Sequence, residues 1–580
     1  MKKLLLYSGL LVFVAGISLT SCNDMLDLSP KDSITGGNFW KNQAQAEGFI
    51  TAMHNMLRGT YASTHLFTLG EQRGGHFIIA SGTIDGSTLG GAGVNQMIIR
   101  QTISETSPGV SNFCGYMGFV ANCNEGIARI GEADYLSEEN RNYMLGMLYG
   151  LRAFAFFDMH RTFGKVVLRT ETDVIDGIYE PTKLYLPRSE CSEVMAQIKR
   201  DLQSSFDCFD KAYENAGAIN VPFYSGAGYC YYWTYEATEA LAADVYLWNA
   251  KVSTGDNRAN PADMATAKEY LLDLYDYYPL ADTFEHVFSE KENTEIILAM
   301  YGDETEYTHP YVGSFLYNSG ANGATMQTGG KSSFTEDGEP WYNIVGHSGG
   351  QCFYEYQNAL FLQYDKNDSR RLATFLPCYH DAAATELKGT FVVKNIGKIS
   401  QLSSYRAFDG DLPFYRSAWV VLSLAEIANY EGNNAEVEQY VNEIRARAFG
   451  DNWDEDLYGY KAGDFTQNEI AILRERTMEF VNEGQRWWDL RRMTLTKDGT
   501  PLVFCKEGAA GYGLPEELMQ TPEVGYNWED PDASGNAEYT VEKTIKPTLD
   551  KSEEYKLLWP LDVTLMSSDP MLEGDQNPGY

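Results

Sequence analysis

Apolar residues recur at helical spacing over most of the chain, and residues at these spacings share one face of an α-helix. The clearest run has spacings of four, three, four and four: Met144, Leu148, Leu151, Ala155 and Met159. Gly164 follows it, and glycine is typical just beyond a helix C-terminus. Small residues at Gly146, Gly150 and Ala153 would let another helix approach closely. The pattern predicts a packed helix that ends at Gly164.

The same pattern predicts five further helices, and strand-like runs are few. The helices begin near Ser189 or span 235–248, 418–430, 435–448 and about 467–493, and the best strand candidates are 295–300 and 391–393. Helix pairs with small residues at their contacts are typical of tetratricopeptide-like arrays, although no clean period of about 34 residues is present. The predicted fold class is therefore mainly α: a tetratricopeptide-like helical scaffold with minor β structure.

Two long stretches, 70–112 and 301–350, carry many Gly and polar residues and no helical period. Irregular segments of this length in a compact protein are usually functional. No Pro- or Ser-rich linker separates domains. We therefore expect one body over 22–580, with an N-terminal half at 22–215, a C-terminal half at 216–580, and a loop-rich insertion at about 301–400.

The first residues have the pattern of a secretory signal. Lys2 and Lys3 precede an apolar run over 4–19, and small residues then lead into Cys22. This ending is similar to a bacterial lipobox, which predicts cleavage after residue 21 and a lipid on Cys22 that anchors the protein to a membrane face. The alternative is an ordinary cleaved signal with an incidental cysteine.

Charge and cysteine content exclude several classes of protein. The net charge of −36 disfavours nucleic acid, which demands a basic surface. The nine cysteines form no C-x-x-C pair, so we expect neither a zinc module nor a small disulfide scaffold. Some cysteines could pair outside the cytoplasm, and the sequence leaves that pairing open.

Five stretches in order give the chain a resemblance to the SusD/RagB family of nutrient-binding outer-membrane lipoproteins. The stretches are CNDMLD at 22–27 with NFWKN at 38–42, GLRAFAFFD at 150–158 running to FG at 163–164, LAEI at 424–427 with VNEIRAR at 441–447, ER at 475–476 with EGQRWWDLRR at 483–492, and QNPGY at 576–580. Together they span nearly the whole chain after the signal.

This resemblance implies a SusD-like scaffold with a variable ligand face. It implies a lipid-anchored location on the outer membrane, exposed at the cell surface, beside a SusC-like TonB-dependent transporter. The protein would capture an oligosaccharide and deliver it to the transporter without cleaving it, so we expect no enzymatic activity and no cofactor. The alternative within the family is a RagB-type member that takes up peptides.

The charged residues of the fourth stretch have a structural interpretation. Glu483, Arg486, Asp489 and Arg492 recur every three residues, and alternating charges at this spacing on a helix form a ladder of pairs. Carboxylates beside so many arginines should stay ionised and paired, which disfavours acid–base catalysis there.

Two motifs suggest other chemistry and are set aside. GHSGG at 346–350 fits the nucleophile elbow of serine hydrolases, but only His380 follows it and the alternating strand–helix units are missing. Asp365, Asn367 and Ser369 have the oxygen spacing of a calcium loop, but Arg370 occupies the position of the required glycine. Calcium is possible and is not predicted, and no histidine pair has metal-ligand spacing.

Ligand contacts are predicted on the two long loops. A sugar offers C–H patches on its ring faces and hydroxyls at its edges, so its site needs exposed aromatic planes beside planar polar groups. The first loop provides Arg73, Phe77 and Asn95, with Glu71 and His76 nearby. The second loop provides the aromatic residues Trp341, Tyr342, Tyr354 and Tyr317, followed by Tyr311, Phe315, Phe353 and Tyr356. Trp341 is the first choice because no other tryptophan lies between 248 and 419. The first loop has no tryptophan, which disfavours starch as the ligand.

Overall fold

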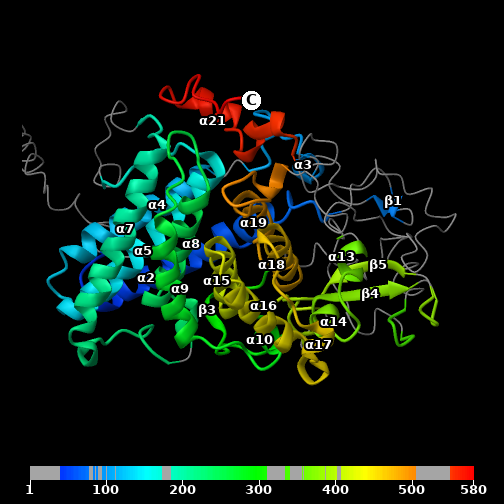
Figure 1. The fold of residues 1–580 in the computed structure, drawn as a ribbon. Helices are drawn as coiled ribbons and strands as arrows, with labels where there is room; N and C mark the ends of the chain where they lie inside the picture. The colour runs from blue at the N-terminus through cyan, green and yellow to red at the C-terminus, as the bar shows by residue number, and fades with distance from the viewer. Residues whose placement is uncertain are drawn as a thin grey trace, which may run out of the picture.

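The computed structural model describes residues 39–504 and 549–580, apart from 78–82, 85–86, 89–93, 100, 111–112, 173–184, 227, 310–333, 340–355, 357, 380, 386 and 402–405. Within this part most residues in regular structure are helical (Figure 1). The longer helices are α2 (Gln43–Tyr61), α4 (Phe113–Gly131), α5 (Glu138–Phe163), α7 (Cys191–Tyr213), α8 (Tyr235–Lys251), α9 (Asp263–Tyr277), α15 (Ser417–Glu431), α16 (Asn434–Phe449) and α18 (Phe465–Glu479). The short ones are α3 (Val94–Ile99), α10 (His286–Ser289), α13 (Asn358–Leu362), α14 (Arg370–Thr374), α17 (Glu455–Tyr458), α19 (Arg486–Arg492) and α21 (Val563–Ser568), with a π-helix at Ala62–Leu69.

Helices α2, α4, α5, α7, α8 and α9 form the layer on the left of Figure 1. Helix α5 is capped at its N-terminus by Ser137, whose side chain accepts the Asn140 N–H, and at its C-terminus by Gly164, which has a positive φ of 76°. Its predicted end is thus confirmed. Helix α7 begins at Cys191 with a capping box between Glu190 and Glu193.

Small residues on α5 set the distance to its neighbours. A Cβ added to Gly146 would lie 2.8 Å from the ring of Phe209 on α7, and one added to Gly150 would lie 2.0 Å from Nε1 of Trp233. Real side chains do not approach this closely, so these positions require glycine for the packing seen. The prediction that small residues mark helix contacts is confirmed here.

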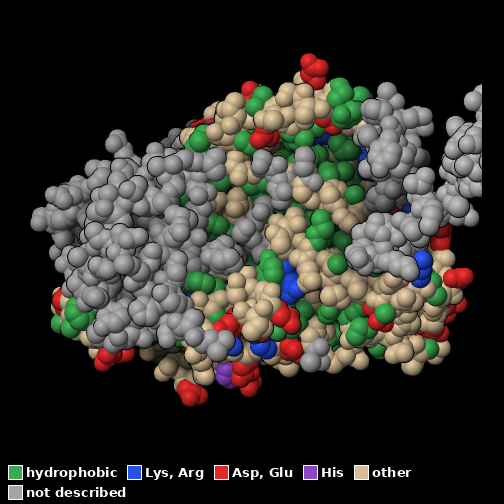
Figure 2. Space-filling model, turned by 180° about the vertical axis from the view of Figure 1, so that it is seen from behind, with side chains coloured by type: hydrophobic (Ala, Val, Ile, Leu, Met, Phe, Trp, Pro, Cys, Tyr) green, Lys and Arg blue, Asp and Glu red, His purple; other side chains and the backbone are tan. Residues whose placement is uncertain are grey.

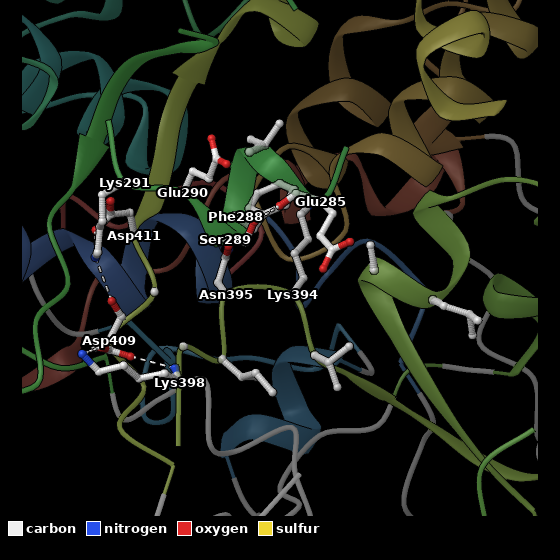
Figure 3. A pocket seen from close by; sticks show the side chains of 17 residues that line it. Glu285, Phe288, Ser289, Glu290, Lys291, Lys394, Asn395, Lys398, Asp409 and Asp411 are labelled. Atoms are coloured by element: carbon white, nitrogen blue, oxygen red, sulfur yellow. Dashed lines mark hydrogen bonds and ion pairs between the residues drawn. The ribbon is translucent and has the colours of Figure 1, made fainter. Parts of the chain in front are cut away.

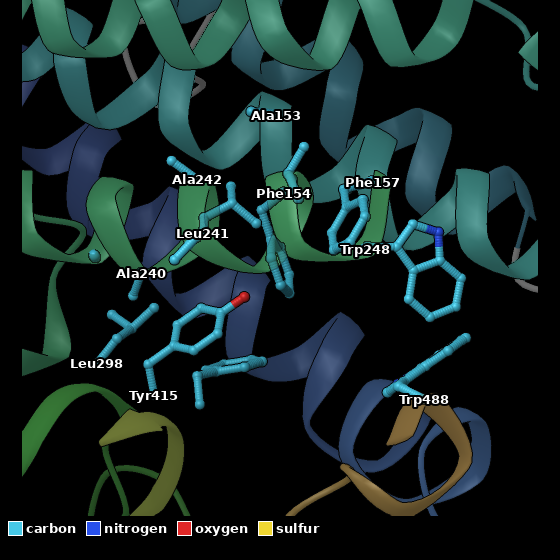
Figure 4. Packing of buried hydrophobic residues seen from close by; sticks show 14 of the residues in the cluster. Ala153, Phe154, Phe157, Ala240, Leu241, Ala242, Trp248, Leu298, Tyr415 and Trp488 are labelled. Carbon is cyan, nitrogen blue, oxygen red and sulfur yellow. The ribbon is translucent and has the colours of Figure 1, made fainter. Parts of the chain in front are cut away.

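Helices α15, α16, α18 and α19 form a second group beside the first, and α15 packs against α9 across the boundary. Figure 4 shows the shared interior, where Trp248 of α8 lies next to both Phe157 of α5 and Trp488 of α19. Ring centroids are 6.3 Å apart for the first pair and 5.9 Å for the second. The N-terminal and C-terminal halves therefore share one hydrophobic core.

Among the described residues, the β structure consists of three two-stranded antiparallel pairs. β3 (Ile296–Met300) pairs with β6 (Leu412–Arg416), β4 (Phe375–Tyr379) with β5 (Leu387–Val392), and β1 (Thr83–Ile84) with β2 (Ser87–Thr88). The strand predicted at 295–300 is confirmed as β3. The strand predicted at 391–393 is the end of β5.

The single helix predicted over 467–493 is wrong. The chain leaves α18 at Glu479 and turns through Asn482 and Gly484, both with positive φ, before α19 begins. Left-handed backbone cannot continue a right-handed α-helix, so the helix ends at this turn. The helical spacing of apolar residues continues across the turn, and the sequence pattern therefore does not reveal it.

The charge ladder predicted for this segment is therefore wrong except at its last step. Arg492 and Asp489 form an ion pair of 2.9 Å on α19. Glu483 lies in the turn and instead accepts Nε of Arg416 at 2.7 Å, while Arg486 donates to the Thr477 hydroxyl at 2.7 Å. These charges tie separate elements together instead of lining one helix.

In the part of the chain that the structure describes, none of the helices is both long and apolar enough to span a membrane.

Candidate functional site

Most of the predicted ligand and lipid positions lie outside the described residues: Cys22, Tyr317, Trp341, Tyr342 and Tyr354, as does the GHSGG motif at 346–350. Asn95 lies in α3, and its side chain is outside the description. Contacts of these residues with a ligand stay predictions.

Arg73 is fully buried, with its guanidinium stacked between two tryptophans. The guanidinium carbon lies 4.2 Å from the Trp487 ring centroid and 5.3 Å from that of Trp559. Its nitrogens donate to Gln101 Oε1 and to the Lys556 carbonyl. Burial lowers the Arg73 pKa to about 10. This arrangement joins three distant segments and gives Arg73 a packing role.

Phe77 is also fully buried and lies in a second hydrophobic cluster, with its ring centroid 4.3 Å from that of Tyr356. Nearby, Glu71 accepts the Gly484 N–H at 3.0 Å, and burial raises its pKa to about 8. The first loop thus contributes buried joints between segments. That Arg73 and Phe77 contact a ligand stays a prediction, and neither side chain faces solvent in this structure.

A solvent-open cavity of about 590 Å³ lies elsewhere, and we call it the tyrosine pocket. Its lining combines tyrosine rings with polar side chains: Tyr231, Tyr232, Tyr301 and Tyr307 with Thr51, His54, Asn55, Arg58, Gly228, Glu292 and Glu306.

Three segments far apart in sequence build this pocket. One face of α2 provides 51–58, a turn before α8 provides 228–232, and the chain around β3 provides 292–307. Gly228 has a positive φ of 84° and precedes the short helical turn Tyr229–Tyr231, which is followed directly by Tyr232. A backbone bridge between Asp303 and Tyr307 fixes the turn that returns Tyr307 toward the pocket.

Arg58 is the cation of the tyrosine pocket. Its guanidinium carbon lies 5.0 Å from the Tyr307 ring centroid and 5.9 Å from that of Tyr301. It donates to the side-chain oxygen of Asn55. Its Nε is buried and has no hydrogen-bond partner among the described residues. Arg58 is therefore held against the rings by cation–π contact and keeps donor capacity unused.

His54 forms the floor and is neutral. Its Nε2 accepts the Trp233 N–H at 2.8 Å, so the proton resides on Nδ1, which donates to the Ile50 carbonyl at 2.8 Å. Burial lowers the His54 pKa to about 4. Its ring packs on Tyr232 with centroids 4.8 Å apart. The floor is thus rigid and uncharged at neutral pH.

Tyr231 is fixed from behind by an ionic contact. Its hydroxyl donates to Asp411 Oδ2 at 2.6 Å, and Lys291 Nζ donates to Asp411 Oδ1 at 2.5 Å. The same ammonium lies 5.0 Å from the Tyr301 ring centroid. The two rings also pack on each other with centroids 4.8 Å apart, so both are held in place at the rim of the pocket.

The tyrosine pocket has the chemistry expected of a sugar site and was not predicted. Its sequence signals are the run Gly-Tyr-Cys-Tyr-Tyr-Trp at 228–233 and the tyrosines at the start of the predicted loop 301–350. Nothing in the sequence links these segments to α2.

Metal chemistry finds no support in the part of the chain described here, where no three His, Cys, Asp or Glu side chains gather into a metal-binding group. In the segment with calcium-loop spacing, the Asp365 carboxylate accepts the Asn367 N–H, and Asp368 accepts from both the backbone and the guanidinium of Arg370 as α14 begins.

Acidic side chains are scattered over the surface. On the face in Figure 2, Asp and Glu stand among neutral groups, and the described Lys and Arg side chains gather into no broad patch. This distribution is unfavourable for a polyanionic ligand.

Comparison with known proteins places these observations among relatives. The model of the SusD family matches residues 391–580. A SusD superfamily protein from Bacteroides fragilis is 42% identical, with a TM-score of 0.77, over 93% of this chain and all of that one. NanU of B. fragilis is 26% identical, with a TM-score of 0.71, over 95% of this chain and all of that one.

Two more distant relatives complete the comparison. SusD-like protein P38 of Formosa agariphila is 23% identical over 82% of this chain and 88% of its own length. Surface glycan-binding protein A from Bacteroides fluxus shares the fold at 16% identity, with a TM-score of 0.61, over 93% of this chain and all of that one.

Proposed function

This chain belongs to the SusD family, and from that premise we propose that it binds glycans at the cell surface, with the tyrosine pocket as a contact site. The observation that carries the proposal is the set of four tyrosine rings beside Arg58 and Asn55 in one open cavity. Aromatic faces accept the C–H patches of a sugar, and planar polar groups bind its hydroxyls. A protein of this fold from B. fluxus is named as a surface glycan-binding protein, which agrees with the proposal.

Calorimetry of the protein from residue 23 onward, without the predicted signal and lipidation site, tests the proposal. The probes are malto-, cello-, xylo- and manno-oligosaccharides, mucin oligosaccharides, and a panel of short peptides. Tyr307→Ala should weaken the glycan that binds by about tenfold or more, whereas Tyr307→Phe, which keeps the ring, should bind nearly as the wild type.

Tyr277 offers a matched control because it is 74% exposed and lies outside the pocket, at the end of α9. Tyr277→Ala should leave affinity unchanged. Binding of peptides alone would favour the RagB-type alternative and contradict a glycan site, as would equal affinities for Tyr307→Ala and the wild type.

Trp341 remains a second proposed contact, in the stretch 301–350 that the sequence predicts to be a loop. If it stacks on the glycan, Trp341→Ala should weaken binding and add to the effect of Tyr307→Ala. Unchanged affinity in Trp341→Ala would remove this residue from the site without affecting the tyrosine pocket.

We further propose that Cys22 carries a lipid and that the protein delivers its ligand to a SusC-like TonB-dependent transporter in the outer membrane. Metabolic labelling with a fatty acid should tag the wild type and not Cys22→Ala. Gentle detergent extraction should co-purify a large outer-membrane barrel with the tagged protein. Labelling of the variant, or extraction of the wild type alone, would contradict the respective part of this proposal.

A further inference from the structure

A second open cavity lies on the other side of the Lys291–Asp411 pair, and we call it the second pocket. Its volume is about 550 Å³. Helix α10 covers one side, and the segments 393–398 and 409–411 form the others. In Figure 3, Lys394 and Asn395 extend toward α10, while Lys291, Asp409 and Asp411 lie together at one side.

The two pockets share a wall. Lys291 and Asp411 line the second pocket, and the neighbouring Glu292 lines the tyrosine pocket. Asp411 accepts the Tyr231 hydroxyl on one side of this wall and the Lys291 ammonium on the other. Lys291 also donates to the carbonyls of Gly302 and Asp409. Asp411 also accepts the Gly302 N–H, so five hydrogen bonds fix the wall.

The lining of the second pocket also offers apolar surface and hydrogen-bonding groups. Leu372 is 52% exposed, and the ring of Phe288 is half-buried. Asn395 is only 3% exposed, and neither atom of its side-chain amide has a hydrogen-bond partner among the described residues. Leaving a buried amide without partners is unfavourable, so an incoming hydroxyl or ordered water at this lining would be favoured.

The cations of the second pocket are already paired with carboxylates. Lys398 lies 3.4 Å from the Asp409 carboxylate, and the buried Lys394 donates to Glu483. An acidic sugar would have to displace these carboxylates in a protein whose net charge is −36. The second pocket therefore suits an uncharged ligand.

From these observations we infer that the two pockets are neighbouring subsites for one uncharged oligosaccharide, which crosses the Lys291–Asp411 wall. The inference rests on the proposed function, because it assumes that the tyrosine pocket holds a sugar. It adds that the ligand is a chain of several sugars and that its affinity comes from both sides of the wall.

A length series tests this inference. The best neutral oligosaccharide of the panel is titrated from monosaccharide to octasaccharide against the wild type and Leu372→Trp, which fills the second pocket from its exposed rim. For the wild type, affinity should rise about tenfold or more between the short and long members. For Leu372→Trp, the long members should lose that gain while the short ones bind as before.

Leu457→Trp is the matched control, because Leu457 is 73% exposed on α17 and lines neither pocket. It should follow the wild-type series. Unaltered binding of the short members also shows that Leu372→Trp is folded.

Affinity that does not grow with chain length, or Leu372→Trp that matches the wild type at every length, overturns the inference. In those cases a loss of binding in Tyr307→Ala would still support the proposed function. If no glycan of any length binds, the proposed function itself fails.

Discussion

At the scale of single residues, Glu71 differs from most buried carboxylates described here because it is buried without a close cation. Asp158, for example, accepts His65 at 2.8 Å and Arg161 at 3.1 Å. Glu71 has the Gly484 N–H as its close donor, and its pKa is raised to about 8. The folded state therefore favours the protonated, neutral form of Glu71.

Glu71→Gln should remove a pH dependence of stability. An acid whose pKa is higher in the folded than in the unfolded state stabilises the fold when protonated, and this contribution is lost as pH rises from about 4.5 to about 8. Because Gln resembles the protonated acid, the unfolding free energy of Glu71→Gln should rise relative to that of the wild type across this pH range. The difference should reach a few kcal/mol at pH 8.

Urea unfolding at pH 5, 6.5 and 8 measures this difference. Glu139→Gln is the control, because the Glu139 carboxylate is exposed and its pKa is lowered. Parallel stability curves for Glu71→Gln and the wild type would show that Glu71 is ionised in the folded protein.

At the scale of elements, the sequence predicts the long helices well because each has its own capping and apolar period. The end of α5 at Gly164 and the span of α8 follow from local signals alone. The break between α18 and α19 does not, because it depends on where Gly484 meets the π-helix Ala62–Leu69. That contact joins segments more than 400 residues apart, and no local pattern encodes it.

The tyrosine pocket could not be predicted from the sequence for the same reason, because contacts between distant segments form it. Aromatic residues in the loops can be recognised from the sequence, but the burial of Arg73 by Trp559 and of Phe77 by Tyr356 is not visible locally. The tyrosine pocket depends on α2 lying beside the turn at 228–232, which only the tertiary packing reveals.

Gly484→Ala should destabilise the fold far more than Gly432→Ala. Both glycines have positive φ, of 74° and 78°, so each substitution carries backbone strain of about 1 kcal/mol or more. A Cβ at Gly432 meets open space, but one at Gly484 would lie 2.6 Å from backbone atoms of Leu66. Equal losses of unfolding free energy, measured by urea titration, would show that this close contact does not constrain the turn.

At the scale of the whole molecule, a buried ionic network joins the C-terminal elements. Arg416, at the end of β6, donates to Glu295, Glu479 and Glu483 at 2.6–2.8 Å. Burial raises the pKa of Glu479, but Arg447, Arg416 and Arg370 outweigh burial and bring that pKa below its ordinary range. Glu479 therefore stays ionised down to low pH, and the network links the start of β3, the end of β6 and the end of α18.

Arg416→Met should cost about 3–5 kcal/mol of unfolding free energy, because it leaves buried carboxylates partly uncompensated. Lys461→Met removes an ion pair with Glu455 that is largely exposed, and it should change stability by less than about 1 kcal/mol. Thermal and urea unfolding of both variants measure the contrast. A loss in Arg416→Met no larger than that in Lys461→Met would show that the remaining cations compensate the network.

The stacking of Arg73 between Trp487 and Trp559 also bears on biogenesis. The ribosome adds roughly 5–20 residues per second, so Arg73 is synthesised about 25–100 s before Trp559. Until then the Arg73 guanidinium can contact Gln101 and Trp487 but lacks the second tryptophan of its stack. The native surroundings of Arg73 are therefore completed only when the C-terminal segment that carries Trp559 has been made.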